Sequence, residues 1–160
     1  MLRSMRPLSS LDIRRYFKKK RNPYFGNVLP KDQLINEYAK YKFMKPEHLK
    51  KFWIVNLDDS LGSGTHWVLC SLLDPEYAVY FDSYGVQPPL EIIAFLKKYR
   101  KNIKCNVEDI QPINSSNCGY YTLYVADELS KGISYENVLD DFTKQVRYND
   151  DLLEQLFAKF

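Results

Sequence analysis

Cysteine and histidine are scarce in this 160-residue chain, and their scarcity excludes several kinds of protein. There are three cysteines and two histidines, and no two cysteines form a C-x-x-C pair. An odd number of cysteines without a secretory signal peptide argues against a disulfide scaffold. We therefore expect free thiols in a reducing compartment and a protein that is not secreted. The histidines form no Cys/His cluster at ligand spacing, so the sequence requires no metal or other cofactor.

Long hydrophobic runs are also missing. The apolar runs are far shorter than the roughly 20 residues that cross a bilayer, so we expect no membrane-spanning segment. Internal repeats, low-complexity tracts and linkers are absent as well, and apolar residues make up 45% of the chain. A chain of this length and composition suits one globular unit. We expect a single domain over residues 1–160 and a monomeric protein.

The hydrophobic pattern predicts a mixture of helices and strands. Ser9 and Asp12 have the spacing of a capping box, which predicts a helix that ends in the basic run at 18–21. Further helices are predicted at 31–41, 90–100, 118–131, 134–142 and 150–160. Strands are predicted at 52–57, 66–73, 77–81 and 103–110, whereas 24–30 is predicted as a loop. The fold class is therefore α+β, with a central mixed β-sheet packed against the helix that begins at Cys118 and flanked by further helices.

Cys118 is the strongest candidate for a reactive residue. An Asn/Ser/Pro-rich loop precedes it and an apolar-periodic segment follows, which is the pattern of a cysteine in the first turn of a helix. The unpaired N–H groups and the helix dipole there favour the thiolate, which is the nucleophilic form. Such a nucleophile needs an imidazole base, a group that orients the base, and donors for the oxyanion. The sequence offers His66, Asp82 and Gln111 for these roles.

Each of these four residues also has an ordinary structural explanation. A cysteine such as Cys118 is often just a small buried side chain, and His66 could be a hydrogen-bonded structural histidine. Asp82 could cap the turn that follows it, and Gln111 could be a loop residue without a special role. The order of the four residues and their contexts, taken together, favour the catalytic interpretation.

The sequence blocks around these residues resemble a known clan of cysteine proteases. The blocks are GTHWV (64–68), YFDSYG (80–85) and NCGYY (117–121), with Gln111 ahead of the last. They resemble the signature of the clan that joins adenovirus-type proteases (adenains) with SUMO-specific proteases of the Ulp type. The resemblance covers about residues 8–130 and implies a papain-like/adenain-like cysteine protease fold.

Three features resemble the adenovirus branch and one resembles the Ulp branch. Six residues lie between Gln111 and Cys118, where Ulp-type enzymes have one fewer. The block NPYFG (22–26) after a short N-terminal helix resembles the start of the adenovirus enzyme, and the chain is too small for the Ulp substrate-binding extensions. Asp82 stands where the adenovirus enzyme has glutamate, and aspartate is the Ulp-type choice.

The resemblance implies a thiol protease that matures the capsid of a DNA virus or of a related element such as a virophage. Such an enzyme cleaves precursor structural proteins at small-residue, glycine-containing sites, in the virion and the host cell. In this role Cys118 is the acylated nucleophile, His66 the general base and acid, Asp82 the group that orients His66, and Gln111 the oxyanion donor. Trp67 would either shield the imidazole–carboxylate pair from water or simply pack in the core.

Two other functions compete with capsid maturation. A Ulp-type deconjugase or processing protease for ubiquitin-like modifiers would use the same chemistry on a different substrate. An inactive basic module that binds DNA or capsid protein would use the fold without the chemistry. A module of that kind has no physical need for all four site residues, so their presence argues against it.

The resemblance also raises the question of an activator. Adenovirus-type proteases are stimulated by DNA and by a short peptide that is tethered through a second cysteine. Cys105 is the nearest candidate for a tether, although an inert core thiol is the alternative, and Cys70 is expected in the core. The basic run Lys18, Lys19, Lys20 and Arg21 either is a solvated helix end or contacts DNA non-specifically, which the net charge of +3 permits.

Overall fold

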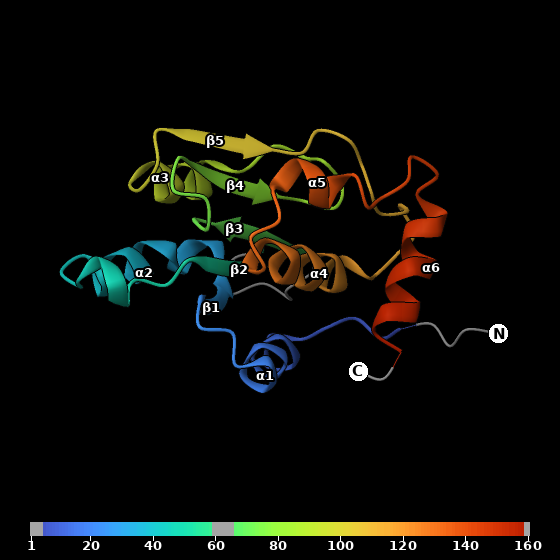
Figure 1. The fold of residues 1–160 in the computed structure, drawn as a ribbon, viewed down its shortest axis with the longest axis horizontal. Helices are drawn as coiled ribbons and strands as arrows, with labels where there is room; N and C mark the ends of the chain where they lie inside the picture. The colour runs from blue at the N-terminus through green and yellow to red at the C-terminus, as the bar shows by residue number, and fades with distance from the viewer. Residues whose placement is uncertain (1–4, 59–65, 159–160) are drawn as a thin grey trace.

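A five-stranded mixed sheet forms the centre of the molecule, with the strands in the order β1-β2-β3-β4-β5 (Figure 1). The structure is a computed structural model and describes residues 5–58 and 66–158. The strands are β1 (Phe25–Pro30), β2 (Phe52–Asn56), β3 (Trp67–Ser71), β4 (Tyr77–Phe81) and β5 (Asn102–Cys105). The two outer pairs, β1/β2 and β4/β5, are parallel, and the inner pairs are antiparallel. The predicted α+β class and the predicted β3–β4 hairpin are confirmed.

Helices cover both faces of this sheet. The helices are α1 (Ser10–Lys20), α2 (Leu34–Tyr41), α3 (Leu90–Lys97), α4 (Cys118–Ser130), α5 (Tyr135–Leu139) and α6 (Arg147–Leu156), with short 3-10 turns η1 (Lys31–Gln33) and η2 (Pro46–His48). One core joins the sheet to α1, α4, α5 and α6, and a second core joins it to α2 and α3. No helix of the described residues is long and apolar enough to span a membrane.

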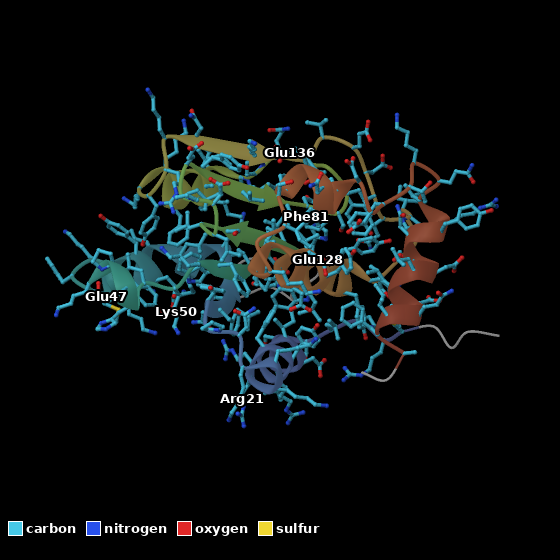
Figure 2. All side chains as sticks on the ribbon, viewed as in Figure 1. Arg21, Glu47, Lys50, Phe81, Glu128 and Glu136 are labelled. Atoms are coloured by element: carbon cyan, nitrogen blue, oxygen red, sulfur yellow. The ribbon has the colours of Figure 1, made fainter. Side chains whose placement is uncertain are left out.

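The central strands are apolar on both faces because both faces are covered. Every residue of β2 and β3 is buried. Ile54 and Leu69 belong to the core on the α4 side, whereas Trp53 and Val55 belong to the core on the α2 side. Strands buried on both faces read as continuous apolar runs rather than as alternating patterns. In Figure 2 Phe81 lies inside the molecule, and Arg21 at the end of α1 points away from the sheet.

The predicted capping box at the start of α1 is confirmed. The Asp12 N–H donates to Ser9 Oγ at 3.2 Å, and the Ser9 N–H donates to Asp12 Oδ2 at 2.8 Å. Arg6 binds the Asp12 carboxylate with two N–H groups at 2.7 and 2.8 Å. These bonds satisfy free N–H groups at the helix start and fix the course of residues 5–9.

Two predictions about strands were wrong. Residues 24–30 were predicted as a loop, but Phe25–Pro30 forms β1, which pairs with β2 in parallel. The predicted strand at 103–110 ends at Cys105, and its remainder leaves the sheet. The last predicted helix also starts earlier than expected, because α6 spans Arg147–Leu156 and residues 159–160 lie outside the described part of the chain.

Candidate active site

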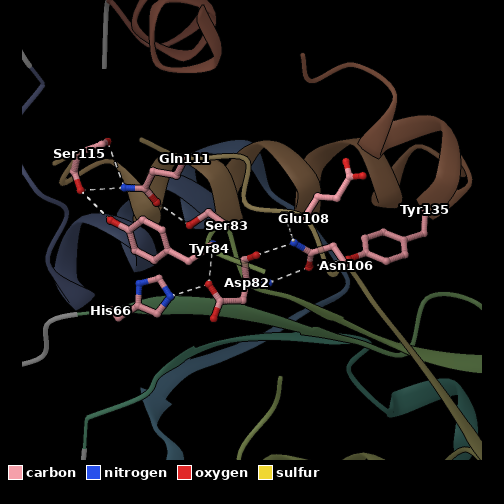
Figure 3. A network of polar contacts seen from close by, with 9 residues as sticks. All are labelled: His66, Asp82, Ser83, Tyr84, Asn106, Glu108, Gln111, Ser115 and Tyr135. Atoms are coloured by element: carbon pink, nitrogen blue, oxygen red, sulfur yellow. Dashed lines mark hydrogen bonds and ion pairs between the residues drawn. The ribbon is translucent and has the colours of Figure 1, made fainter. Parts of the chain in front are cut away.

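His66 and Asp82 meet at one edge of the sheet because β3 and β4 are antiparallel. His66 immediately precedes β3 and Asp82 immediately follows β4, and Leu69 is paired with Phe81 between them. His66 Nε2 lies 2.8 Å from Asp82 Oδ1 (Figure 3). The Asp82 side chain is 1% exposed and that of His66 is 17% exposed. A hydrogen bond between an imidazole and a buried carboxylate is the contact that the predicted triad requires. Gly64 and Thr65 of the first sequence block lie outside the described residues.

Tyr84 holds the imidazole and the carboxylate in place from the next turn of chain. Its ring stacks on the His66 imidazole, with the ring centres 5.1 Å apart and the planes at 29°. Its N–H donates to Asp82 Oδ1 at 2.8 Å, and its hydroxyl donates to the Ser115 carbonyl at 3.0 Å. The Asp82 carboxylate oxygen that contacts His66 is therefore fixed by a second bond.

Cys118 is the first residue of α4 and opens into the same cavity as His66. The hydrogen bonds of the helix begin with the N–H groups of Tyr120 and Tyr121, which both donate to the Asn117 carbonyl. The Cys118 amide therefore belongs to the first turn, where N–H groups have no partner within the helix. Cys118 is 8% exposed and lines a cavity of about 330 Å³. The other lining residues are Pro7, Leu8, His66, Trp67, Tyr84, Ser115 and Ser116.

The surroundings of His66 favour its protonated form. Burial lowers the pKa of His66, but hydrogen bonds to Asp82 and to Cys118, together with their negative charges, raise it to about 9. Cys118 and His66 line the same cavity, which places the thiol on the same side of the molecule as the imidazole. Because Asp82 binds Nε2, the remaining ring nitrogen, Nδ1, is the one available to Cys118. A thiolate–imidazolium pair is the reactive state of a cysteine nucleophile with a histidine partner.

Gln111 lies beside the cavity with its amide fixed at both ends. The Ser83 hydroxyl donates to Gln111 Oε1 at 2.5 Å, so the amide oxygen of Gln111 faces Ser83. Gln111 Nε2 donates to the Ser115 carbonyl at 2.9 Å and to Ser115 Oγ at 3.1 Å. The amide N–H groups thus point toward Ser115, which lines the cavity, while Gln111 itself is 1% exposed.

The segment that precedes α1 forms one wall of the cavity. The Trp67 indole N–H donates to the Leu8 carbonyl at 2.9 Å, and the Tyr120 hydroxyl donates to the Arg6 carbonyl at 3.0 Å. Leu8 also packs so closely on Gly119 that a Cβ there would lie 3.0 Å from the Leu8 side chain. Trp67 is 6% exposed and part of the core on the α4 side, so it combines core packing with lining the cavity.

The other two cysteines lie away from this cavity. Cys70 of β3 is fully buried, and burial raises the pKa of its thiol. Cys105 is the last residue of β5 and is half-buried, and burial raises the pKa of its thiol as well. All three cysteines are free. Within residues 5–58 and 66–158, no group of three or more His, Cys, Asp or Glu side chains could hold a metal ion.

Sequence reasoning assigned no role to four residues that touch the site residues, and Tyr84, which contacts His66 and Asp82, is the first of them. Ser83 orients Gln111, Ser115 accepts its N–H groups, and Asn106 contacts the backbone of Asp82 through both ends of its side chain. Ser83 and Tyr84 stand inside the block at 80–85, and Ser115 stands in the polar loop that precedes Cys118. Asn106 stands in no such block, and only the three-dimensional structure brings it to Asp82.

Solved structures of cysteine proteases share this architecture. The ASFV pS273R protease is similar with a TM-score of 0.60 and 16% identity, over 90% of this chain and 66% of that one. The SUMO protease Ulp1 is similar with a TM-score of 0.55 and 20% identity, over 96% of this chain and 80% of that one. The chain has the fold of the Ulp/adenain-like cysteine proteases. The resemblance stated from the sequence blocks is confirmed at the level of the fold.

A third structure with the Ulp/adenain-like fold covers nearly the whole chain. The Xanthomonas campestris effector XopD, solved bound to ubiquitin, matches 99% of this chain and 93% of its own, with a TM-score of 0.50 and 13% identity. The chain spans just under two thirds of the ASFV protease. No protein-family profile matches the sequence, and no curated protein is similar enough to match it.

Proposed function

We propose that this protein is a cysteine endopeptidase in which Cys118 is the nucleophile. The observation that carries the proposal is that Cys118 and His66 line one cavity while the buried Asp82 binds His66. Cys118 begins α4, His66 precedes β3, and Asp82, at the end of β4, binds His66 at 2.8 Å. A buried carboxylate orients the imidazole and stabilises its protonated form, as a cysteine–histidine pair requires.

The proposed reaction has two halves. In the first, the Cys118 thiolate attacks the carbonyl carbon of the scissile bond, and the carbonyl becomes an oxyanion. The His66 imidazolium then gives its proton to the leaving amine as the C–N bond breaks, which leaves a thioester on Cys118. In the second half His66 takes a proton from water, the resulting hydroxide equivalent attacks the thioester, and the product acid leaves. Cys118 is released as thiolate and His66 is again protonated.

The oxyanion would be bound by the Cys118 N–H and the Gln111 amide. The Ser83 hydroxyl holds Gln111 Oε1, so that the Nε2 group faces Ser115 beside the cavity. A substrate carbonyl would replace Ser115 as the acceptor of one of these N–H groups. Preformed donors of this kind stabilise the transition state because they need no reorganisation during the reaction.

We infer that the substrates are precursor capsid or structural proteins, cut at small-residue, glycine-containing sites during virion maturation. Two observations support this substrate class: the adenovirus-type spacing between Gln111 and Cys118, and the similarity of the fold to a viral protease, that of ASFV. The site of action would then be the virion and the host cell.

A second candidate is a processing protease for ubiquitin-like modifiers. It is supported by Asp82, the Ulp-type choice at this position, and by the fold similarity to the SUMO protease Ulp1 and to XopD bound to ubiquitin. Both candidates use the same chemistry, so the substrate decides between them.

Co-expression with the major capsid protein of the same genome tests the proposal. Wild type and Cys118→Ala are each expressed with the capsid protein, and the products are weighed by intact-mass analysis. We expect cuts after small residues with the wild type and none with Cys118→Ala, which should keep its fold by circular dichroism. Intact capsid protein, together with labelling of Cys118 by a ubiquitin-like probe, would instead assign the second candidate. Turnover by Cys118→Ala would refute the mechanism for both.

A further inference from the structure

The side chain of Asn106 continues the sheet where the strands stop pairing. The β4–β5 pairing ends with Tyr80 opposite Cys105. Two residues beyond Tyr80, the Asp82 N–H donates to Asn106 Oδ1 at 3.1 Å, and Asn106 Nδ2 donates to the Asp82 carbonyl at 2.6 Å (Figure 3). The side-chain amide therefore takes the place of a peptide group of the missing strand. It satisfies both backbone groups of the residue whose carboxylate binds His66.

Asn106 is itself held by an element from a distant part of the chain. Tyr135, the first residue of α5, donates its hydroxyl to Asn106 Oδ1 at 3.1 Å and also lies 3.2 Å from the Tyr80 carbonyl. Asn106 Nδ2 also lies 3.3 Å from the Glu108 carbonyl. Asn106 is 5% exposed and Tyr135 is 3% exposed, so water competes little for these bonds.

The position of the Asp82 carboxylate depends on the bonds from Asn106 to the Asp82 backbone, because only one of the two carboxylate oxygens makes hydrogen bonds of its own within the described part of the chain. Asp82 Oδ1 takes the bond from His66 and the bond from the Tyr84 N–H. Asp82 Oδ2 is buried and has no hydrogen-bond partner among the described residues. The direction of the carboxylate is therefore set by the Oδ1 bonds and by the placement of the Asp82 backbone, which Asn106 fixes on both sides.

We propose that Asn106, backed by Tyr135, is a positioning residue that holds Asp82 against His66 and so maintains the thiolate–imidazolium pair at Cys118. This inference rests on the proposed function and adds to it a residue that follows β5 and the first residue of α5, both outside the catalytic blocks. Asn106 and Tyr135 together are called the clamp here, because their hydrogen bonds hold the Asp82 backbone. Without the clamp, the Asp82 backbone gains freedom and the bond from His66 to Asp82 Oδ1 weakens. The imidazolium then loses stabilisation, and the pH range over which the ion pair persists narrows from both sides.

The test measures the ion pair directly, without a substrate. The rate at which iodoacetamide alkylates Cys118 is followed from pH 5 to 10 by peptide mapping, for wild type, Asn106→Ala and Tyr135→Phe. Tyr135→Phe removes one hydroxyl and keeps the ring, so it reports on the clamp even where Asn106→Ala fails to fold. Asn149→Ala is the matched control. Asn149 is also a buried asparagine with three hydrogen bonds, to Ile110 and Thr143, and it contacts neither Asp82 nor His66.

We expect the acid limb of the alkylation profile to move to higher pH in Asn106→Ala. At a fixed pH on that limb the rate should fall about tenfold, which corresponds to a move of one pH unit. Tyr135→Phe should show a smaller change in the same direction, and Asn149→Ala should keep the wild-type profile even if it unfolds more easily. The inference would be overturned if Asn106→Ala and Tyr135→Phe both kept the wild-type profile. If Asn106→Ala does not fold, a wild-type profile in Tyr135→Phe is enough to overturn it. An equal change in Asn149→Ala would overturn it too. If wild-type Cys118 itself reacts only at alkaline pH, like an ordinary thiol, the proposed function fails, and that result is distinct from the others.

Discussion

At the scale of single residues, the protonation of His66 decides the chemistry. Burial opposes a charge on the imidazole, but Asp82 and Cys118 offset burial and raise the pKa of His66 to about 9. An unperturbed histidine would lose its proton near pH 6.5. His66 is therefore charged at neutral pH, as the proton donor of the proposed reaction must be.

The pH dependence of activity follows from this shift. We expect kcat/KM on a cleaved peptide to fall as pH rises through about 9, where His66 loses its proton. In Asp82→Ala burial remains but the carboxylate is gone, so this alkaline limb should move down by more than one pH unit. The raised pKa of His66 also increases the free energy of unfolding. This contribution is fully present below pH about 6.5, the pKa of an unperturbed histidine, and is lost as pH rises through about 9, the pKa of His66 in the folded protein. An alkaline limb that does not move in Asp82→Ala would contradict the assigned role of Asp82.

Removing the Gln111 amide should slow turnover without changing the nucleophile. Gln111→Ala should lower kcat by roughly 10²–10³, the usual effect of losing one oxyanion donor. The pH profile of Cys118 alkylation should stay unchanged, because Gln111 touches neither His66 nor Asp82. Gln111→Glu is the control, since it keeps the acceptor for Ser83 but has no N–H donor, and it should be at least as slow. A loss smaller than threefold in Gln111→Ala would remove Gln111 from the mechanism.

Sequence reasoning reaches some of these residues and not others. Cys118, His66 and Asp82 stand in local contexts that carry a signal, namely a helix start and two strand ends. Asn106 carries none, because its role depends on where the β4–β5 pairing stops and on Tyr135, which lies 29 residues further along the chain. Contacts of that range are set by tertiary packing.

At the scale of elements, β1 shows why one strand escaped prediction. Gly26 and Asn27, with prolines at both ends, read as a loop. Gly26 is needed for another reason: a Cβ there would lie 2.4 Å from the Trp53 indole nitrogen, so only glycine lets β1 lie beside β2. The helices were easier to predict because their caps and periodicity are local. The sheet order could not be predicted, because parallel pairs join segments far apart in sequence.

The capping box of α1 offers a test at this scale. Ser9→Ala removes the side-chain acceptor of the Asp12 N–H and should lower the free energy of unfolding by about 1 kcal/mol. Urea denaturation measures the change. Ser10→Ala is the control, because Ser10 is the neighbouring exposed serine and stands inside the helix rather than at its cap. An equal loss in Ser10→Ala would show that the cap is not the cause.

At the scale of the whole molecule, the fold places the cavity and the basic end of α1 on separate parts of the surface. Lys18, Lys19 and Lys20 are exposed at the C-terminus of α1, where cations complement the helix dipole. The cavity lies near the opposite end of α1, because Pro7 and Leu8, which precede the N-terminus of this helix, line it. A polyanion bound to the three lysines would therefore leave the cavity open to a substrate.

Whether the basic run at the end of α1 contacts DNA or is only a solvated helix end can be tested through this separation. Added DNA at low salt should raise the turnover of a peptide substrate, and the effect should fade as salt rises, since binding to phosphates is salt-dependent. Replacing Lys18, Lys19 and Lys20 with glutamine should remove most of the effect. The same replacement of the exposed Lys40, Lys42 and Lys45 near α2 removes an equal charge and should not. Activity that is indifferent to DNA would end the proposal.

The most direct test of the central claim compares the three cysteines within one protein. Limiting iodoacetamide is added to the folded protein at pH 6.5, and the alkylated positions are quantified by mass spectrometry. If His66 and Asp82 activate Cys118, it should react first and far faster than the more accessible Cys105, and His66→Ala should abolish this preference. If Cys105 reacts as fast as Cys118 in the wild type, the site is not that of a cysteine protease.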